Sequence, residues 1–97
     1  MGKVIKCCVP SCTDKTSTRH RFPVYEEEVF NTWLERIQNS DLTSKHPMDV
    51  YKTSYICERH FLQVCVVPNS KRKMLNHYSR PTVDLPSKNY FLYYIIT

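Results

Sequence analysis

Four residues in this sequence have the types and the spacing of metal ligands. Cys7 and Cys12 are separated by four residues, and Cys57 and His60 are separated by two. Zinc prefers tetrahedral sets of four ligands drawn from thiolate and imidazole. Each pair can reach one ion from a single turn, so protein atoms would fill all four positions. A closed set of this kind predicts a structural zinc site, because a catalytic zinc keeps one position for water.

The remaining cysteines leave alternatives open. Cys8 is adjacent to Cys7, and a Cys8-x3-Cys12 pair is geometrically conceivable, so spacing alone does not decide the first ligand. Cys8 and Cys65 are otherwise interpreted as small buried hydrophobic residues. Free cysteines with a surface histidine are the simplest alternative to a metal site. A disulfide framework is disfavoured, because five is an odd number of cysteines and the absence of a secretory signal suggests a reducing compartment.

The charge of the chain is unevenly distributed. The chain has 97 residues, which predicts one domain, and its formal net charge is +5. Residues 24–42 carry five acids and one base, whereas the rest of the chain carries four acids and thirteen bases. A basic body beside an acidic segment predicts one face suited to a polyanion, with ordinary solvation of surface lysines as the alternative. No apolar run is long enough to span a bilayer.

The clearest element that must position these residues is a helix at about 26–39. Val29, Phe30, Trp33, Leu34 and Ile37 form one apolar stripe at helical spacing, behind three glutamates at 26–28. Short strands are predicted at 20–22 and 53–57, polar loops at 13–19 and 41–52, and a tight metal knuckle at 57–61. The predicted fold class is therefore α+β, with two short strands around one helix and long loops. Zinc would tie the start of this chain to its middle.

The ordered motifs resemble those of the THAP domain, a C2CH zinc module of animal DNA-binding proteins and of some transposases. They are Cys7-x4-Cys12, Phe22-Pro23, Trp33, Cys57-x2-His60-Phe61 and Pro81-Thr82. The resemblance predicts a domain at 1–86, followed by an apolar aromatic tail of unknown role at 87–97. The opening Cys7-Cys8-Val9-Pro10-Ser11-Cys12 is similar to family members in which the first of two cysteines is the ligand. The resemblance therefore implies Cys7 rather than Cys8.

The resemblance also implies an architecture and a binding mode. It implies a two-stranded antiparallel sheet, with the helix between strands near 20–22 and 55–57. It implies DNA binding through the sheet in the major groove and through a basic loop in the minor groove. The fold-defining positions that match are Phe22, Pro23, Trp33, Phe61 and Pro81.

Two departures from the family pattern affect these expectations. The closing motif usually reads Ala-Val-Pro-Thr-hydrophobic, but here it is Ser79-Arg80-Pro81-Thr82-Val83, so Arg80 either loosens the packing or faces DNA. Ile5 stands where a polar residue often contacts bases, so either Lys6 or Lys3 takes over that contact or it is absent.

The placement of charge predicts a DNA-binding face without the family. The predicted helix is acidic, and laying it in a groove would bring carboxylates against phosphates, which disfavours a recognition helix of the usual kind. Arg21 on a strand is expected to fork onto a guanine edge, and Arg72 in the basic run 71–73 to enter a narrow minor groove. Lysines suit phosphate contacts. The full predicted set is Lys3, Lys6, Arg19, Arg21, Lys45, Lys52, Lys71, Arg72 and Lys73.

The sequence thus predicts a zinc-dependent module that binds double-stranded DNA sequence-specifically in the nucleus. It leaves the oligomeric state open and favours a monomer. A zinc-stabilised protein-interaction module without DNA specificity is the alternative. No enzymatic activity is expected, because no Ser/His/Asp or paired-carboxylate arrangement stands out, and Glu58 has no open coordination site to serve. Neither a membrane nor a small-molecule substrate is expected as a partner.

Overall fold

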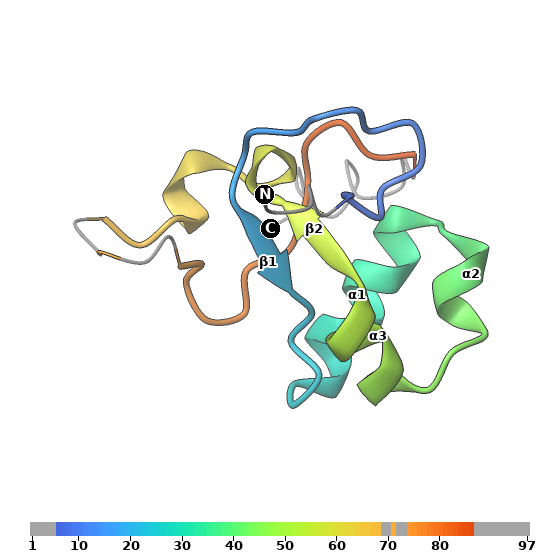
Figure 1. The fold of residues 1–97 in the computed structure, drawn as a ribbon. Helices are drawn as coiled ribbons and strands as arrows, with labels where there is room; N and C mark the ends of the chain where they lie inside the picture. The colour runs from blue at the N-terminus through green and yellow to red at the C-terminus, as the bar shows by residue number, and fades with distance from the viewer. Residues whose placement is uncertain (1–5, 69–70, 72–73, 87–97) are drawn as a thin grey trace.

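The chain folds around a small antiparallel sheet with helices between its two strands (Figure 1). The computed structural model describes residues 6–68, 71 and 74–86. The strands pair with Arg19 opposite Cys57 and Arg21 opposite Tyr55. The predicted α+β class is confirmed. The elements are β1 (Arg19–Arg21), α1 (Glu27–Ile37), α2 (Ser40–Thr43), α3 (Pro47–Thr53) and β2 (Tyr55–Cys57), followed by 3-10 turns at Glu58–His60 and Gln63–Cys65.

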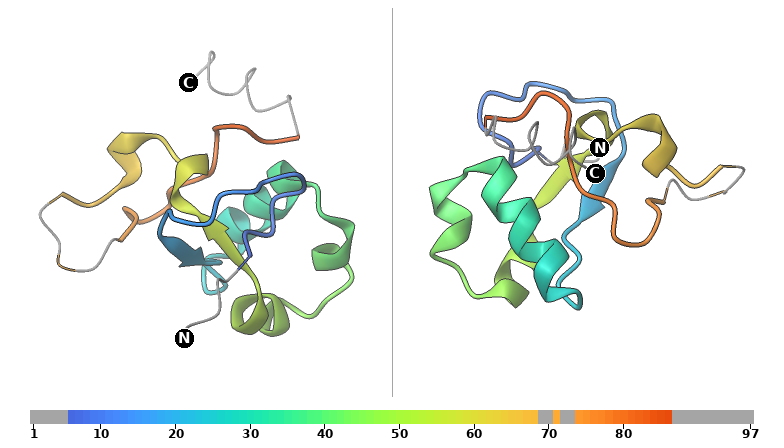
Figure 2. Two further views of the ribbon diagram at one scale, coloured as in Figure 1. Left: turned by 45° about the horizontal axis from the view of Figure 1, so that its top comes forward. Right: turned by 180° about the vertical axis from the view of Figure 1, so that it is seen from behind.

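Helix α1 covers one face of the sheet and supplies four buried residues to the core, Val29, Phe30, Trp33 and Ile37. These residues belong to the apolar stripe that the sequence predicts, whose fifth member, Leu34, is half-buried. Trp33 lies 5.2 Å from Phe22 and 5.1 Å from Phe61 between ring centroids. Seen from behind, α1 lies in front of the strands (Figure 2). The opposite face of the sheet is therefore the one directed away from α1.

Alternation along the strands assigns side chains to these two faces. His20 and Ile56 are paired and buried, so they lie on the inner face against the core. Because neighbouring residues of a strand point to opposite faces, Arg21 and Tyr55 lie on the outer face. Arg21 is exposed and Tyr55 is half-buried.

The prediction of a polar loop at 41–52 is wrong, because this segment forms α2 and α3. The Asn39 side chain accepts from the Asp41 amide at 3.0 Å and caps α2, and His46 accepts from the Met48 amide at 3.1 Å and caps α3. Leu42 and Val50 anchor the two helices in the core. One buried residue in each short helix leaves no periodic pattern in the sequence. The first strand also begins one residue earlier than predicted, and Phe22 lies just beyond it.

Two of the predicted fold-defining residues, Phe22 and Phe61, pack against a third, Trp33. Phe22, Trp33, Phe61 and Pro81 are buried, and Pro23 is half-buried. Over the residues that the structure describes, no helix has the length and apolar character needed to cross a membrane.

Candidate metal centre and the surface around it

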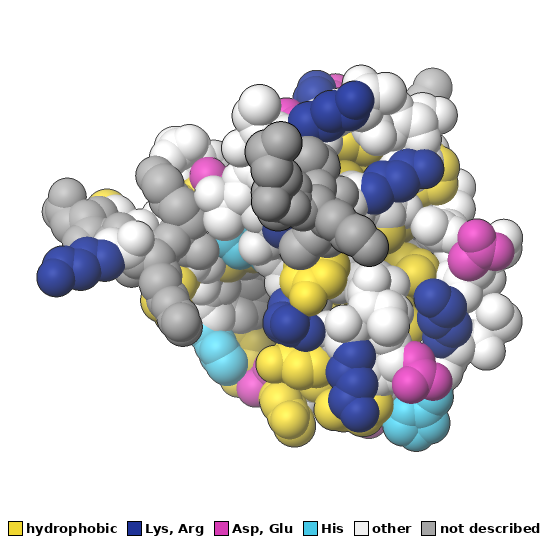
Figure 3. Space-filling model, in the orientation of Figure 1, with side chains coloured by type: hydrophobic (Ala, Val, Ile, Leu, Met, Phe, Trp, Pro, Cys, Tyr) yellow, Lys and Arg dark blue, Asp and Glu magenta, His cyan; other side chains and the backbone are white. Residues whose placement is uncertain are grey.

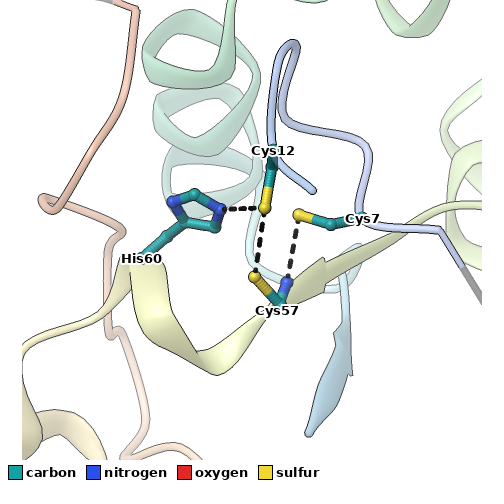
Figure 4. Close-up of side chains that lie close together, drawn as sticks. All are labelled: Cys7, Cys12, Cys57 and His60. Atoms are coloured by element: carbon teal, nitrogen blue, oxygen red, sulfur yellow. Dashed lines mark hydrogen bonds between the residues drawn. The ribbon is translucent and has the colours of Figure 1, made fainter. Parts of the chain in front are cut away.

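The four predicted ligands meet at one point (Figure 4). The ligand atoms of Cys7, Cys12, Cys57 and His60 all lie within 4.8 Å of one another. The Sγ atoms of Cys12 and Cys57 are 3.6 Å apart, and His60 Nε2 is 3.4 Å from Cys12 Sγ. Two thiolates bound at about 2.3 Å to a tetrahedral zinc would lie roughly 3.8 Å apart. The cluster therefore fits one zinc ion.

The N-terminal segment delivers two of these ligands by turning back on itself. The Cys12 amide donates to the Val9 carbonyl at 3.1 Å, and Ser11 takes a left-handed conformation with φ 69°. Cys7 forms a parallel bridge with Tyr55, and the Cys8 amide donates to the Tyr55 carbonyl at 2.8 Å. These bonds place the segment along β2, next to Cys57.

His60 is oriented by the segment that follows it much later in the chain. Its Nδ1–H donates to the Val83 carbonyl at 2.9 Å, while the Thr82 and Val83 amides donate to the His60 carbonyl at 2.8 and 3.0 Å. A partner of this kind fixes the tautomer and the ring orientation of a metal-ligating histidine. Nε2 is thereby left to face the cluster.

Burial of the cluster opposes charge on its ligands. Desolvation raises the pKa of the Cys7 and Cys57 thiols and lowers the pKa of His60. A bound cation reverses this effect for thiols, because metal coordination deprotonates them outright. The donor set then consists of thiolates and a neutral imidazole, which is the state that zinc requires.

The structure selects Cys7 over Cys8 as the first ligand, as the family resemblance implies. Cys8 lies outside the cluster and packs half-buried against the core. Its burial raises the pKa of its thiol to about 12. Cys65 is also half-buried and outside the cluster.

The metal site and the segments that it joins define a class of protein. A closed site of three cysteines and one histidine joins the N-terminal segment to β2, and the 3-10 turn after β2 is clasped by residues 82–83. The chain is a small domain organised around structural zinc.

Comparison with known families identifies the domain. The family model described as the THAP domain matches residues 7–84, and the chain belongs to this family. THAP domains are zinc-coordinating DNA-binding modules and are not typically catalytic. Searches among curated proteins and among solved structures found no match.

The predicted DNA-binding residues are not all equivalent in the structure. Lys6, Lys45, Lys52 and Lys71 are exposed, and Arg21 is exposed on the outer face of the sheet. Lys3, Arg72 and Lys73 lie outside the described residues, as do Ile5 and the tail at 87–97.

Arg19 is occupied within the protein. Its side chain is only 11% exposed, lies 3.3 Å from Asp14 Oδ1 and donates to the Ser17 carbonyl at 2.8 Å. The Asp14 carboxylate also accepts hydrogen bonds from the Ser17 amide and hydroxyl, which with Arg19 lower the pKa of Asp14 to about 2. Arg19 therefore holds the loop before β1 in place.

Arg80 lies beside the acidic start of α1. It lines a hollow with Glu26, Glu27 and Glu28, and its Nη1 donates to the Tyr78 carbonyl at 3.1 Å. Its neighbouring Pro81 remains fully buried, so the arginine has not displaced the packing there.

Three residues at or near these sites escaped prediction from the sequence. Val83 acts through its carbonyl, which no side-chain pattern reveals. Tyr51 lies in a segment that the sequence predicts as a loop, and Tyr55 faces Arg21 only because of the strand register. Alternation along β2 predicts that Tyr55 and Cys57 share one face of the sheet. It does not predict which residues of other segments they contact.

Proposed function

We propose that this protein binds double-stranded DNA sequence-specifically, with the outer face of its sheet in the major groove. The observation that carries the proposal is that Arg21, opposite Tyr55 in the register of the sheet, is exposed on its outer face. Helix α1 covers the other face of the sheet (Figures 1 and 2). The major groove is wide enough for a two-stranded ribbon. Helix α1 itself packs on the other face of the sheet, and Glu26, just before it, lines a hollow that also contains Arg21.

Lysines around the sheet provide the positioning contacts in this proposal. Lysine and arginine side chains are spread over the face that carries the sheet (Figure 3). Lys6 flanks β2 through the N-terminal segment, Lys52 belongs to α3, and Lys45 stands in the turn before α3. Such charges bind phosphates and set the register on DNA without reading its sequence.

The late basic run completes the proposed interface. Lys71 is exposed, and we assign Arg72 to the minor groove and Lys73 to its phosphates on the grounds of their sequence alone. Lys3 is likewise assigned to a phosphate from sequence. Arg19 contributes by holding its loop rather than by touching a base, because Asp14 and Ser17 engage it.

Arg21→Ala tests the major-groove assignment. A duplex site is first selected with the zinc-loaded protein, and dissociation constants are then measured for it and for a duplex with one guanine replaced. Each bidentate arginine–guanine contact is worth about 1–3 kcal/mol of discrimination. The ratio of the two dissociation constants should therefore fall roughly fivefold to 150-fold in Arg21→Ala. Parental binding should weaken steeply with salt.

Lys52→Ala is the matched control for this experiment. Removing a phosphate contact should weaken binding about equally for both duplexes and reduce the salt slope by about 1. If the parent binds no duplex even at low salt, the DNA proposal fails and a protein partner is favoured. If Arg21→Ala retains full discrimination, the face assignment fails.

Location and stoichiometry follow from the same proposal. A protein that acts on chromosomal DNA is expected in the nucleus, which a fluorescent fusion would test. We propose that one copy binds one site, which sedimentation of the complex would test.

A further inference from the structure

We infer that Tyr51 and Tyr55 are positioning residues that hold the Arg21 guanidinium ready for a base, which makes α3 part of the recognition surface. The inference rests on the proposed function, because it assigns these tyrosines a role in reading DNA through Arg21. It adds residues that no motif of the sequence indicates.

The arginine is held between two aromatic rings. Its guanidinium carbon lies 5.1 Å from the centroid of the Tyr51 ring and 5.0 Å from that of Tyr55. Both distances are within the range of cation–π attraction, about 6 Å. Arg21 Nη1 also donates to the Tyr51 carbonyl at 2.8 Å. Three contacts from two elements therefore fix one exposed side chain.

The tyrosines are themselves supported. Tyr55 is fixed by the register of β2, directly opposite Arg21. Tyr51 lies in the last turns of α3, which Val50 anchors in the core. The Tyr25 ring packs edge-on against the Tyr51 ring, with centroids 6.4 Å apart. The Tyr51 and Tyr55 rings around Arg21 are thus positioned by the folded domain itself.

Holding the Arg21 side chain in place before DNA binds lowers the entropic cost of binding. An unrestrained arginine loses rotamer freedom when it binds a base, at a cost of roughly twofold to tenfold in affinity for each ordered side chain. A guanidinium has five N–H donors in a planar fork, so the bond to the Tyr51 carbonyl leaves donors for a ligand. The rings should therefore increase affinity for the cognate site, where Arg21 bonds to a base, more than for other sites.

A purely structural role is the competing explanation. Arg21 also joins β1 to α3, so the same contacts could serve only to stabilise the domain. That role predicts a change in stability with no change in base discrimination. The two explanations are separated by readouts other than stability.

The first experiment compares tyrosine variants on the selected duplex and on its guanine-replaced counterpart. We expect Tyr51→Leu and Tyr55→Leu each to lose about twofold to tenfold of the discrimination, with the salt slope unchanged because no charge is removed. Tyr51→Phe should keep it, since the ring rather than the hydroxyl holds Arg21. Tyr78→Leu is the matched control, because Tyr78 is an exposed tyrosine that contacts the His77 ring. It should discriminate as the parent does.

The second experiment tests whether the tyrosines act through Arg21. In an Arg21→Ala background, Tyr51→Leu should cause no further loss of discrimination. In the free, zinc-loaded protein, the NMR order parameter of the Arg21 side-chain Nε–H should fall in Tyr51→Leu and stay high in Tyr51→Phe. This measurement needs no DNA and remains available if a variant binds poorly.

The outcomes distinguish the two levels of the proposal. If the parent does not discriminate between duplexes, or Arg21→Ala discriminates fully, the proposed function fails. If Arg21→Ala loses discrimination while Tyr51→Leu and Tyr55→Leu keep all of it, the inference is overturned and the proposed function stands. Equal order of Arg21 in the parent and in Tyr51→Leu would also overturn the inference.

Discussion

Cys7 and Cys8 are adjacent residues of the same type, and the backbone direction separates their roles. The segment that contains them runs alongside β2, with Cys7 bridged to Tyr55 and the Cys8 amide bonded to the Tyr55 carbonyl. Cys7 lies in this bridge and in the metal cluster, whereas the chain bends at Cys8. Cys8 packs against the core outside the cluster. Only one of the two can therefore be the first ligand in this fold.

This assignment predicts different consequences for two matched substitutions. Cys7→Ser should abolish stoichiometric zinc binding and cooperative folding, because a serine hydroxyl does not replace a thiolate ligand. Cys8→Ser should still bind one zinc per chain and lose only about 1 kcal/mol of stability, from burying a more polar group. Elemental analysis of the purified variants and thermal melts measure both effects. Retention of full zinc occupancy by Cys7→Ser would contradict the assignment.

At the scale of elements, helix ends decide how the chain between the strands is routed. Helix α1 ends at Ile37, and Gln38 then takes a left-handed conformation with φ 52° while its amide donates to the Leu34 carbonyl at 3.1 Å. Asn39 follows at once as the cap of α2. This sharp change of direction allows the Asn39 side chain to donate to the Cys8 carbonyl at 2.8 Å. The end of α1 thereby supports the metal-binding turn.

Gln38→Gly should stabilise the domain, because glycine adopts the left-handed conformation without the steric cost that a Cβ imposes. The left-handed conformation costs a residue with a Cβ roughly 1–2 kcal/mol, and the greater chain entropy of glycine offsets roughly 0.5–1 kcal/mol of that gain. We therefore expect a net increase of about 1 kcal/mol or less in the free energy of unfolding of the zinc-loaded protein, measured by denaturant titration. Gln38→Ala is the control, since it removes the same side chain but keeps the Cβ. Equal stability for the two variants would show that backbone strain at this position is not significant.

At the scale of the whole molecule, the metal cluster and the core hold the same segments together. Trp33 Nε1 donates to the Ser79 carbonyl at 2.8 Å, and Arg36 Nη1 donates to the Pro81 carbonyl at 3.1 Å. Residues 82–83 bind the His60 backbone and ring. The late part of the described chain is thus attached both to α1 and to a zinc ligand, which couples the metal to the folding of the domain.

Removal of zinc should therefore unfold the domain. Structural zinc contributes an apparent 10–16 kcal/mol or so in zinc-finger peptides, while a domain of this size is stable by only about 5–15 kcal/mol. Trp33, the single tryptophan, is buried at 3% exposure, so chelation should shift its fluorescence emission to longer wavelength. Added zinc should restore the emission and magnesium should not. A cooperative melt that persists in excess chelator would contradict this prediction.

Sequence patterns predicted the parts of this fold that depend on local rules. The stripe from Val29 to Ile37 identified α1 to within two residues at each end, because helical periodicity is a property of neighbouring residues. Helices α2 and α3 were missed, since each buries a single apolar anchor and begins at a cap that also suits a loop. Arg19 and Arg21 have the same type and flank the same residue, yet one is held by Asp14 and the other lies exposed between two tyrosines.

The sequence by itself determined three of the zinc ligands, the main helix and the class of fold, because ligand chemistry and periodicity depend on residue types and short spacings. The choice of Cys7 over Cys8 as the fourth ligand came from the family resemblance and from the tertiary structure. The tertiary structure decided which basic residues face outward together. Strand register put Tyr55 opposite Arg21, and α3 brought Tyr51 to the same guanidinium from thirty positions away. Such contacts depend on how segments distant in the chain are packed, and packing around the zinc and Trp33 fixes that arrangement only when the whole domain has folded.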